Sequence, residues 1–426
     1  MQIASYVKSF LLENKTTKQT LIKNTLWLTL SSFVGRILGA ILAIYIVRFL
    51  GPTEYGKFAF ALAFVSLFVS FLDFGISPIA TREFAKDKKK EEYFDSLLSL
   101  KILLGFGTVA LIIISSYFIT ADSKILDIIR ILALFTFLSQ LPEFVYSFLT
   151  AREKFEHISW LSIVQVILTV AIGLFVAIKF PSAKNISYAY LFSSFLALFP
   201  VFIFFHLKVF PLKLSFNVNV WKKFLMLSWP LALISIFTLI YGYIDSIIMG
   251  FLGKVTEVGY YSAASKVALF ITTPAGLITS SFYPVLSRLS GSSPESFKKA
   301  SNSQTLFIIF LILPIVLLSI IFAPQIINFF YGVENYTPSI FAFQILTLAI
   351  GVSAVYRSFN MTLIVANEQK KVLFITILGA IANTILNLIL IPRFSFYGAA
   401  FASLSTHLLL FVLYLFLAKK MVFKKI

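Results

Sequence analysis

Twelve long apolar stretches, joined by short polar connections, constrain this chain more than any other feature. A helix needs about 20 mostly apolar residues to cross the hydrocarbon core of a membrane. Such stretches lie near residues 24–49, 58–80, 96–119, 126–149, 158–179, 188–207, 224–249, 259–285, 304–323, 339–364, 372–391 and 397–418. The connections between them are too short for a separate domain outside the membrane. We therefore expect the functional residues to lie within the helices.

The composition agrees with a chain whose main solvent is lipid. Charged residues make up 13% of the sequence, whereas an ordinary soluble domain has about 25%. A transmembrane β-barrel is the other closed structure that a membrane tolerates, but its strands alternate apolar and polar residues. The unbroken apolar run Val109–Ile114 has no such alternation. The sequence therefore predicts an all-α polytopic membrane protein with about 12 transmembrane helices.

The distribution of lysine and arginine predicts the orientation, because short cytoplasmic loops retain positive charge. Of the 36 Lys and Arg residues, 24 lie in the N-terminal segment, the even-numbered connections and the C-terminal segment. Seven lie in the odd-numbered connections, and five lie within the spans. Both termini are therefore expected to be cytoplasmic, in a multi-pass protein of the plasma membrane.

Other binding classes are not supported by the sequence. The formal net charge is +18, but the basic residues are spread over separate segments and no basic helix carries interleaved aromatic residues, so we expect no nucleic-acid partner. Cysteine is absent, and His157, His206 and His407 are far apart in the sequence. We therefore expect no metal site and no cofactor.

The chain contains an internal repeat with a period of six spans. Phe49–Gly56 follows the first span, and Phe251–Gly259 follows the seventh with one inserted residue. A second, shorter similarity pairs Ala151–Lys154 with Ala366–Gln369. Because six is even, the two halves should share one orientation, related by an approximate two-fold axis along the membrane normal.

This repeat predicts the domain organisation. We expect five parts along the chain: a cytoplasmic segment at 1–23, a six-helix bundle at 24–207, a cytoplasmic linker at 208–223, a second six-helix bundle at 224–418 and a cytoplasmic tail at 419–426.

Polar residues within the spans form stripes at helical spacing. Ser66, Ser70, Asp73 and Ser77 share one face of a helix, since steps of three and four residues return to the same side. Similar stripes combine Asp245 with Ser235, Thr238 and Gly242, and Arg357 with Ser353 and Asn360, while Asn383 and Asn387 form a pair. These stripes predict a shared, water-accessible cavity lined in part by Asn360, Asn383 and Asn387. The alternative, that Asn and Ser join helices by hydrogen bonds, stays open.

Cations within the spans favour an anionic cargo. A charge in hydrocarbon costs several kcal/mol unless it is paired, hydrated or near the surface. Arg36, Lys266 and Arg357 are therefore predicted to face the cavity and to bind a diphosphate, with Lys101 as a further candidate that could also reach the membrane surface. Arginine and lysine both bind phosphate groups. Asp245 and Asp73 are candidates for coupling transport to an ion, or for pairing with these cations.

Two segments resemble a known transporter family. One comprises Arg48–Gly56 (RFLGPTEYG), Leu72–Ile76 (LDFGI) and Thr81–Glu83 (TRE); the other runs from Asp245–Gly250 into Leu252–Tyr261. They are similar to the polysaccharide-transport branch, the Wzx-type flippases, of the multidrug, oligosaccharidyl-lipid and polysaccharide exporter superfamily, over nearly the whole chain. The resemblance implies two six-helix bundles around a central cavity, alternating access and a polyprenyl-diphosphate-linked oligosaccharide as substrate. Some members of the family carry fourteen spans, and this sequence shows twelve.

The functional prediction is a flippase for a lipid-linked oligosaccharide rather than an enzyme. Its expected partners are this substrate, the membrane lipids, and the polymerase and glycosyltransferases of the same polysaccharide. One alternative is a cation-coupled multidrug antiporter of the same fold, which would favour acidic residues in the cavity. Another is a membrane-embedded glycan polymerase, although such enzymes usually present catalytic residues on large external loops, and the external connections here are short.

Overall fold

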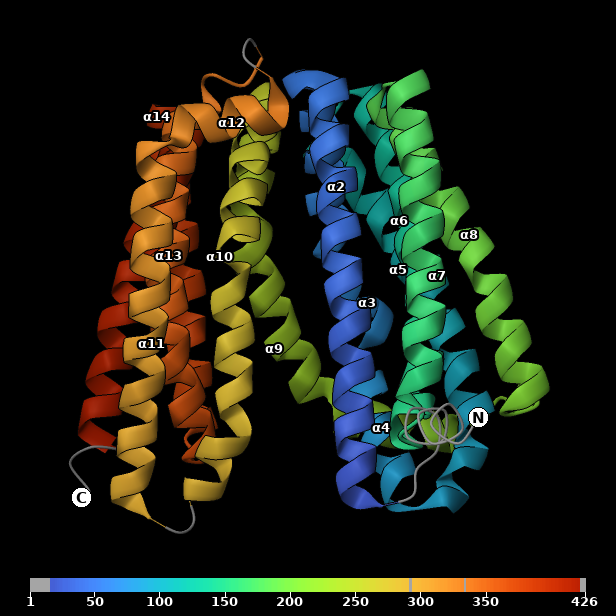
Figure 1. The fold of residues 1–426 in the computed structure, drawn as a ribbon. Helices are drawn as coiled ribbons and strands as arrows, with labels where there is room; N and C mark the ends of the chain where they lie inside the picture. The colour runs from blue at the N-terminus through green and yellow to red at the C-terminus, as the bar shows by residue number, and fades with distance from the viewer. Residues whose placement is uncertain (1–15, 291–292, 333–334, 422–426) are drawn as a thin grey trace, which may run out of the picture. The chain divides into compact units, whose positions relative to one another are not determined.

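A computed structural model describes residues 16–290, 293–332 and 335–421. Within these ranges every regular element is a helix (Figure 1). Of the expected cytoplasmic segments, residues 1–15 and 422–426 lie outside the described residues. The all-helical class that the apolar stretches predict is confirmed.

Ten helical runs in the described chain are long and apolar enough to cross a membrane. Two of them contain a residue with non-helical backbone angles in mid-run, Gly51 in α2 and Ser395 in α14. Dividing the runs at these two residues gives twelve segments that correspond to the twelve apolar stretches, and the first run, Gln19–Lys86, is broken once more at Phe74 and Gly75, close to its end. Gly51 has φ +70°, and Pro52 follows it as the first residue of the next helical segment, a position that suits proline because its missing N–H would have no helical partner.

The chain divides into two compact units. Of the described residues, unit 1 comprises 16–49 and 64–236, and unit 2 comprises 50–63, 237–290, 293–332 and 335–421. Two helices therefore contribute to both units: α2 passes into unit 2 after Phe49, and α9 passes from unit 1 into unit 2 after Ile236. The sequence instead predicts two bundles, at 24–207 and 224–418, joined by a linker at 208–223. The observed units differ from these bundles because α2 and α9 each contribute to both units.

Unit 1 contains the N-terminal helices. They are α2 (Thr17–Ser66, in part), α3 (Val69–Asp73), α4 (Ile76–Lys86), the 3-10 helix η1 (Lys88–Tyr93), α5 (Phe94–Ile119), α6 (Ser123–Ala151), α7 (Phe155–Lys179), α8 (Ala183–Lys208) and the start of α9 (Val218–Phe251). Helix α6 packs against α4, α5, α7 and α8, so it forms the centre of the unit.

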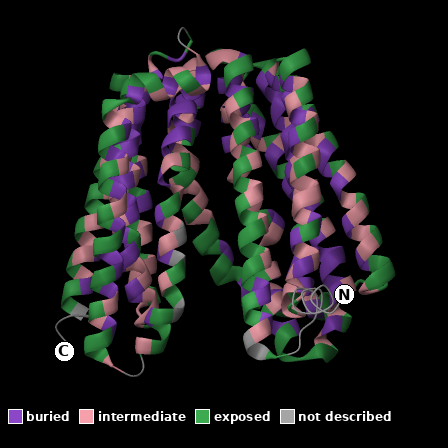
Figure 2. Ribbon diagram, viewed as in Figure 1, coloured by how far each residue is buried: buried purple, intermediate pink, exposed green. Residues whose placement is uncertain are grey.

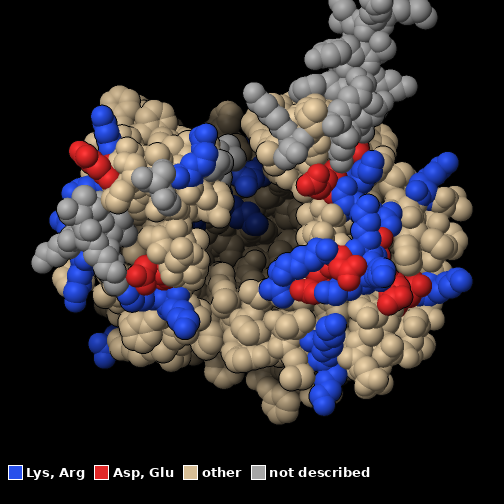
Figure 3. All heavy atoms as spheres, turned by 90° about the horizontal axis from the view of Figure 1, so that it is seen from below, with Lys and Arg blue, Asp and Glu red and all other residues tan. Residues whose placement is uncertain are grey.

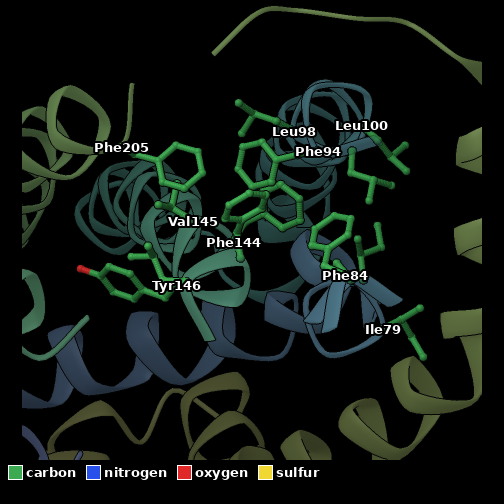
Figure 4. Packing of buried hydrophobic residues seen from close by; sticks show 14 of the residues in the cluster. Ile79, Phe84, Phe94, Leu98, Leu100, Phe144, Val145, Tyr146 and Phe205 are labelled. Carbon is green, nitrogen blue, oxygen red and sulfur yellow. The ribbon is translucent and has the colours of Figure 1, made fainter. Parts of the chain in front are cut away.

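An aromatic cluster holds one end of unit 1 together (Figure 4). Phe94 of α5 stacks on Phe144 of α6 with ring centroids 4.8 Å apart, and Phe205 of α8 lies 4.9 Å from Phe94. Phe84 of α4 and Phe148 of α6 complete the contact. Aromatic pairs at these separations contribute about 0.5–1.5 kcal/mol each beyond their buried area.

Unit 2 contains the C-terminal helices. Besides the parts of α2 and α9, they are α10 (Val255–Ser290), α11 (Pro294–Ile321), α12 (Ala323–Tyr331), α13 (Ser339–Val365) and α14 (Gln369–Met421). Helix α13 packs against α10, α11 and α14 and occupies the centre of the unit. Its buried face includes small residues, among them Ala342, Ala349 and Gly351, and small residues allow helices in a membrane to approach closely.

Many residues are exposed, drawn green in Figure 2, and large apolar residues are frequent among them. On α11 they recur every three to four residues, at Leu306, Phe310, Leu313, Leu317 and Ile321. A soluble protein would bury such a stripe. Here the stripe is the surface expected to face lipid.

The same helix-ending turn occurs three times. Glu153, Gly253 and Asn367 each follow a helix with positive φ, and in each turn two backbone N–H groups donate back to carbonyls of the preceding helical turn. This is the Schellman arrangement. Two of these turns lie in the segments Ala151–Lys154 and Ala366–Gln369, which are similar in sequence. The residues with positive φ are Glu153 and Asn367, whereas the sequence alignment pairs Glu153 with Glu368. The sequence alignment is therefore shifted by one residue relative to the turns.

Lys, Arg, Asp and Glu side chains are frequent on the surface drawn in Figure 3. In the connections between helices, Lys90 pairs with Glu83 at 2.6 Å, Arg152 with Glu91 at 2.6 Å, and Lys371 with Glu368 at 2.9 Å. Each of these pairs lies in or beside an even-numbered connection, which the charge distribution predicts to be cytoplasmic.

Candidate functional site

A pocket of about 410 Å³ lies within unit 2, between the second segment of α2, α9 and α10. Each helix lines it with residues of a single face. On each helix the lining residues recur at helical spacing. They are Tyr55, Phe58, Ala59, Leu62 and Ala63 on α2, Thr238, Gly242 and Asp245 on α9, and Ser262, Lys266 and Leu269 on α10. The polar stripe expected around Asp245 therefore lines a real cavity, except Ser235, which bonds to Ser70 at 2.7 Å in unit 1.

Asp245 is buried, with 7% of its surface exposed, and its carboxylate is held by two donors. The hydroxyl of Tyr261 donates to Oδ2, and the backbone N–H of Ser246 donates to Oδ1 at 2.6 Å. Tyr261 also contacts Ser403 Oγ of α14 at 3.2 Å. No Lys or Arg among the described residues forms an ion pair with Asp245, so its charge is met by hydrogen bonds alone.

Lys266 lines the same pocket and is exposed. Its ammonium group makes no hydrogen bond or ion pair with any residue that the structure describes. A carboxylate and an unpaired ammonium thus share one cavity whose other walls are mostly apolar and aromatic. Such a cavity can bind an anionic group at Lys266 and a cation or proton at Asp245.

Arg357 lies on α13 of unit 2, with an exposed side chain that forms no ion pair in the described ranges. Beside it is a polar network: Tyr241 OH lies 3.0 Å and Tyr356 OH 3.1 Å from His407 Nδ1. The network continues to α14, where Tyr414 stacks on Tyr356 at 5.4 Å. Arg357 is within electrostatic range of Tyr241, Tyr356 and His407.

The three asparagines predicted to line the cavity all form hydrogen bonds between helical segments or within them. Asn360 donates to Tyr414 OH at 3.1 Å. Asn383 donates to Thr406 Oγ1 at 3.2 Å, and Asn387 donates to the backbone oxygen and the side-chain oxygen of Asn383, both at 3.0 Å. Asn383 and Asn387 are buried. Asn360 and Asn383 thus join helical segments, the alternative left open by the sequence, whereas Asn387 bonds one turn back on its own segment.

In unit 1, Lys101 and Asp73 form a partly buried ion pair. Lys101 Nζ lies 2.6 Å from Asp73 Oδ1, and Ser77 donates to the same carboxylate oxygen from both its hydroxyl and its N–H. Asp73 ends α3, and Phe74 and Gly75 then break the helix in the left-handed conformation before α4 begins at Ile76. Only 1% of the Lys101 side chain is exposed, so its ammonium group serves Asp73 in this structure.

Arg36 lies in the first segment of α2, in unit 1, and its side chain is exposed. No described residue forms a hydrogen bond or ion pair with it. Gly35 and Gly39 flank it, and a Cβ at Gly35 would lie 3.8 Å from Val166 of α7 while one at Gly39 would meet open space. Arg36 therefore extends from α2 without the ion partner that Lys101 has.

Several contacts of the site are not indicated by the sequence. Tyr261, Tyr241, Tyr356 and His407 all enter polar networks in unit 2, yet aromatic residues are frequent throughout the chain. One weak signal exists, since Tyr241 precedes Asp245 by four residues and so shares its helix face.

Comparison with known proteins identifies similar sequences. The profile of the family described as "Polysaccharide biosynthesis protein" matches residues 21–290, which is more than half of the chain, and the profile described as "MatE" matches residues 230–389. The capsular polysaccharide biosynthesis protein CapF of Staphylococcus aureus is 24% identical over 394 residues, covering 89% of this chain and 94% of CapF.

Solved structures share the fold. The lipid II flippase MurJ in an inward closed conformation superposes with a TM-score of 0.76 at 20% identity, covering 93% of this chain and 87% of MurJ. An inward-facing multidrug resistance MATE family transporter of the MOP superfamily superposes with a TM-score of 0.75 at 14% identity, covering 91% of this chain and 94% of that protein.

Proposed function

Since the chain belongs to the polysaccharide biosynthesis protein family, we propose that it is a flippase that moves a polyprenyl-diphosphate-linked oligosaccharide across the plasma membrane by alternating access. Family membership makes the chain a polysaccharide biosynthesis protein, and its shared fold with a flippase and a MOP superfamily transporter supports transport rather than catalysis. The glycan polymerase alternative has no such support.

The observation that supports this proposal most directly is the unpaired ammonium group of Lys266 in the unit 2 pocket. A charge within a membrane-spanning helix costs several kcal/mol unless something compensates it. A diphosphate would supply that compensation, and the aromatic and apolar walls formed by Tyr55, Phe58 and Leu62 suit a lipid-linked cargo. Arg36 and Arg357, which also lack ion partners among the described residues, are further candidates for the diphosphate.

The test measures transport in cells that depend on this protein. Wild type is replaced by Lys266→Gln, Lys266→Arg, Arg36→Gln or Arg357→Gln, and lipid-linked glycan is quantified on each membrane leaflet. We expect glycan to accumulate on the cytoplasmic leaflet for Lys266→Gln and to be restored in part by Lys266→Arg, which keeps the charge. Lys124→Gln, an exposed lysine outside the pocket, serves as the control that should transport normally.

The outcome that contradicts the diphosphate assignment is normal transport by all three charge-removing variants at wild-type expression. Unchanged glycan distribution after depletion of the protein itself would contradict the flippase proposal as a whole, since the cargo would then cross without it. The two results can be told apart. If only the diphosphate assignment is wrong, depletion of the protein still changes the glycan distribution, although the charge variants transport normally.

Asp245 and the MatE match over residues 230–389 support one alternative, a cation-coupled multidrug antiporter. A carboxylate in the pocket would suit a cationic drug. This alternative predicts that cells lacking the protein retain cationic dyes, and that Asp245→Asn abolishes their export while glycan distribution stays normal.

The remaining parts of the proposal concern placement. We propose that both termini are cytoplasmic and that the pairs around Lys90, Arg152 and Lys371 lie at the cytoplasmic surface, because lysine and arginine concentrate in those connections. The polymerase and glycosyltransferases that make the same polysaccharide are the proposed partners.

A further inference from the structure

A second pocket, of about 420 Å³, lies within unit 1 at the charged end of α6, α7 and α8. Its polar wall consists of Arg152, Lys154, His157 and Lys208. Its apolar wall consists of Leu149, Phe204 and Val209. None of these residues belongs to the sites described above, so this pocket is separate from the proposed cargo site.

The pocket carries an excess of positive charge. Arg152 is committed to a forked pair with Glu91, with N–O distances of 3.0 and 2.6 Å. Glu156 is held by the buried Lys23 at 2.8 Å. Lys154 lies 3.9 Å from Glu156, at the limit of an ion pair. In and beside the pocket, the four cations Arg152, Lys154, Lys208 and Lys23 are therefore balanced by two carboxylates, those of Glu91 and Glu156.

Two lysines are therefore available to a ligand. Lys208, the last residue of α8, is exposed and makes no hydrogen bond or ion pair in the described part of the chain. Lys154 is the residue before α7 and gives that helix no side-chain cap. The free N–H groups at the start of a 25-residue helix add partial positive charge at the same place.

The surroundings place this pocket at the level of lipid headgroups. Trp160, one turn into α7, is 63% exposed, and tryptophan concentrates at membrane–water interfaces. On α8, Ile203 and Leu207 are also exposed and precede Lys208. An apolar surface thus leads directly to the basic pocket, in whose wall the ring of His157 lies 4.8 Å from that of Phe204.

We propose that this pocket binds the phosphate-bearing headgroup of an anionic phospholipid from the adjacent leaflet. Lys154 and Lys208 contact the phosphate oxygens, and Leu149, Phe204 and Val209 pack against the first carbons of the acyl chains. A lipid fits better than a free phosphate ion because the apolar wall and the exposed apolar faces of α7 and α8 would otherwise be left without a partner. Basic pockets between transmembrane helices are known to bind such headgroups.

The test uses the purified full chain in nanodiscs of neutral phosphatidylcholine, to which cardiolipin or phosphatidylglycerol is added, with thermal stability and retained lipid by native mass spectrometry as readouts. A lysine near an anionic leaflet strengthens binding about five-fold. Loss of one lysine should therefore weaken lipid binding about five-fold, and loss of both should weaken it about thirty-fold. Lys154→Gln, Lys208→Gln and the double variant are compared with Lys222→Gln, an exposed lysine that does not line the pocket.

We expect both anionic lipids to raise the melting temperature of wild type and Lys222→Gln, and the double variant to lose that gain and the retained lipid. An equal gain in the double variant overturns the proposal. An equal rise in melting temperature when inorganic phosphate is added to neutral nanodiscs, without anionic lipid, also overturns the proposal and assigns the pocket to a free anion. Because both variants remove surface charge only, normal melting in neutral lipid checks that they fold.

Discussion

The hydroxyl oxygens of Thr53 and Thr256 lie 3.0 Å apart, and these two residues hold equivalent places in the two sequence repeats. The neighbouring contacts are reciprocal. A Cβ at Gly56 would lie 1.9 Å from the carbonyl oxygen of Val255, and a Cβ at Gly259 would lie 2.0 Å from that of Pro52. Equivalent residues of the two repeats thus touch each other reciprocally where the second segment of α2 crosses α10 within unit 2.

This crossing predicts that Gly56→Ala and Gly259→Ala destabilise the protein by similar amounts. Either methyl group would overlap a backbone carbonyl, which cannot move aside as a flexible side chain can. Overpacking costs about 1–3 kcal/mol, so each variant should melt at a lower temperature in detergent. Gly107→Ala is the matched control, because a Cβ there meets nothing within 4 Å. Wild-type melting of both crossing variants would show that the helices do not approach so closely.

Loss of Lys101 should destabilise unit 1. Lys101→Met leaves the Asp73 carboxylate, whose side chain is 22% exposed, without its cation. Breaking a fully buried pair costs about 3–5 kcal/mol, so the loss expected for this partly buried pair is at or below about 3 kcal/mol. Asp73→Asn should be similarly harmful, whereas the double variant should recover much of the loss, since the two effects are coupled. A double-mutant cycle of thermal or denaturant unfolding measures this coupling. Additive effects would mean that Lys101 and Asp73 act separately, as the cargo-binding assignment of Lys101 requires.

The sequence predicts the helices and their breaks better than it predicts side-chain partners. Gly51 and Pro52 indicate the interruption of α2 because each has a backbone preference of its own. The pairing of Lys101 with Asp73 is not visible in the same way, since the two residues lie on different helices and helical spacing gives a face but not the neighbour that the face meets. Ser235 and Asp245 illustrate the same limit, because they share a stripe on α9 while α9 passes from one unit to the other after Ile236.

The charge distribution predicts which connections are cytoplasmic, and single cysteines can report it because the chain has none of its own. Cysteines at the exposed positions Lys89 and Lys299 should resist a membrane-impermeant thiol reagent in intact cells. A cysteine at the exposed Lys124, in an odd-numbered connection, should react. Labelling after permeabilisation controls for accessibility. Reaction at Lys89 or Lys299 in intact cells would reverse the proposed orientation.

Asp245 should couple transport to an ion. Its carboxylate lines the pocket, accepts hydrogen bonds from Tyr261 and Ser246, and has no ion pair with a described cation. A carboxyl group in a water-poor cavity can bind a proton or a sodium ion and release it when the cavity opens to water. Flipping in sealed vesicles should therefore respond to an imposed proton or sodium gradient in wild type and lose that response in Asp245→Asn. Tyr261→Phe keeps the carboxylate but removes one donor, so it should retain the response with a shifted dependence on pH or sodium concentration. Flipping that ignores both gradients in all three proteins would leave Asp245 a structural partner of Tyr261, and the cargo would then move down its own gradient.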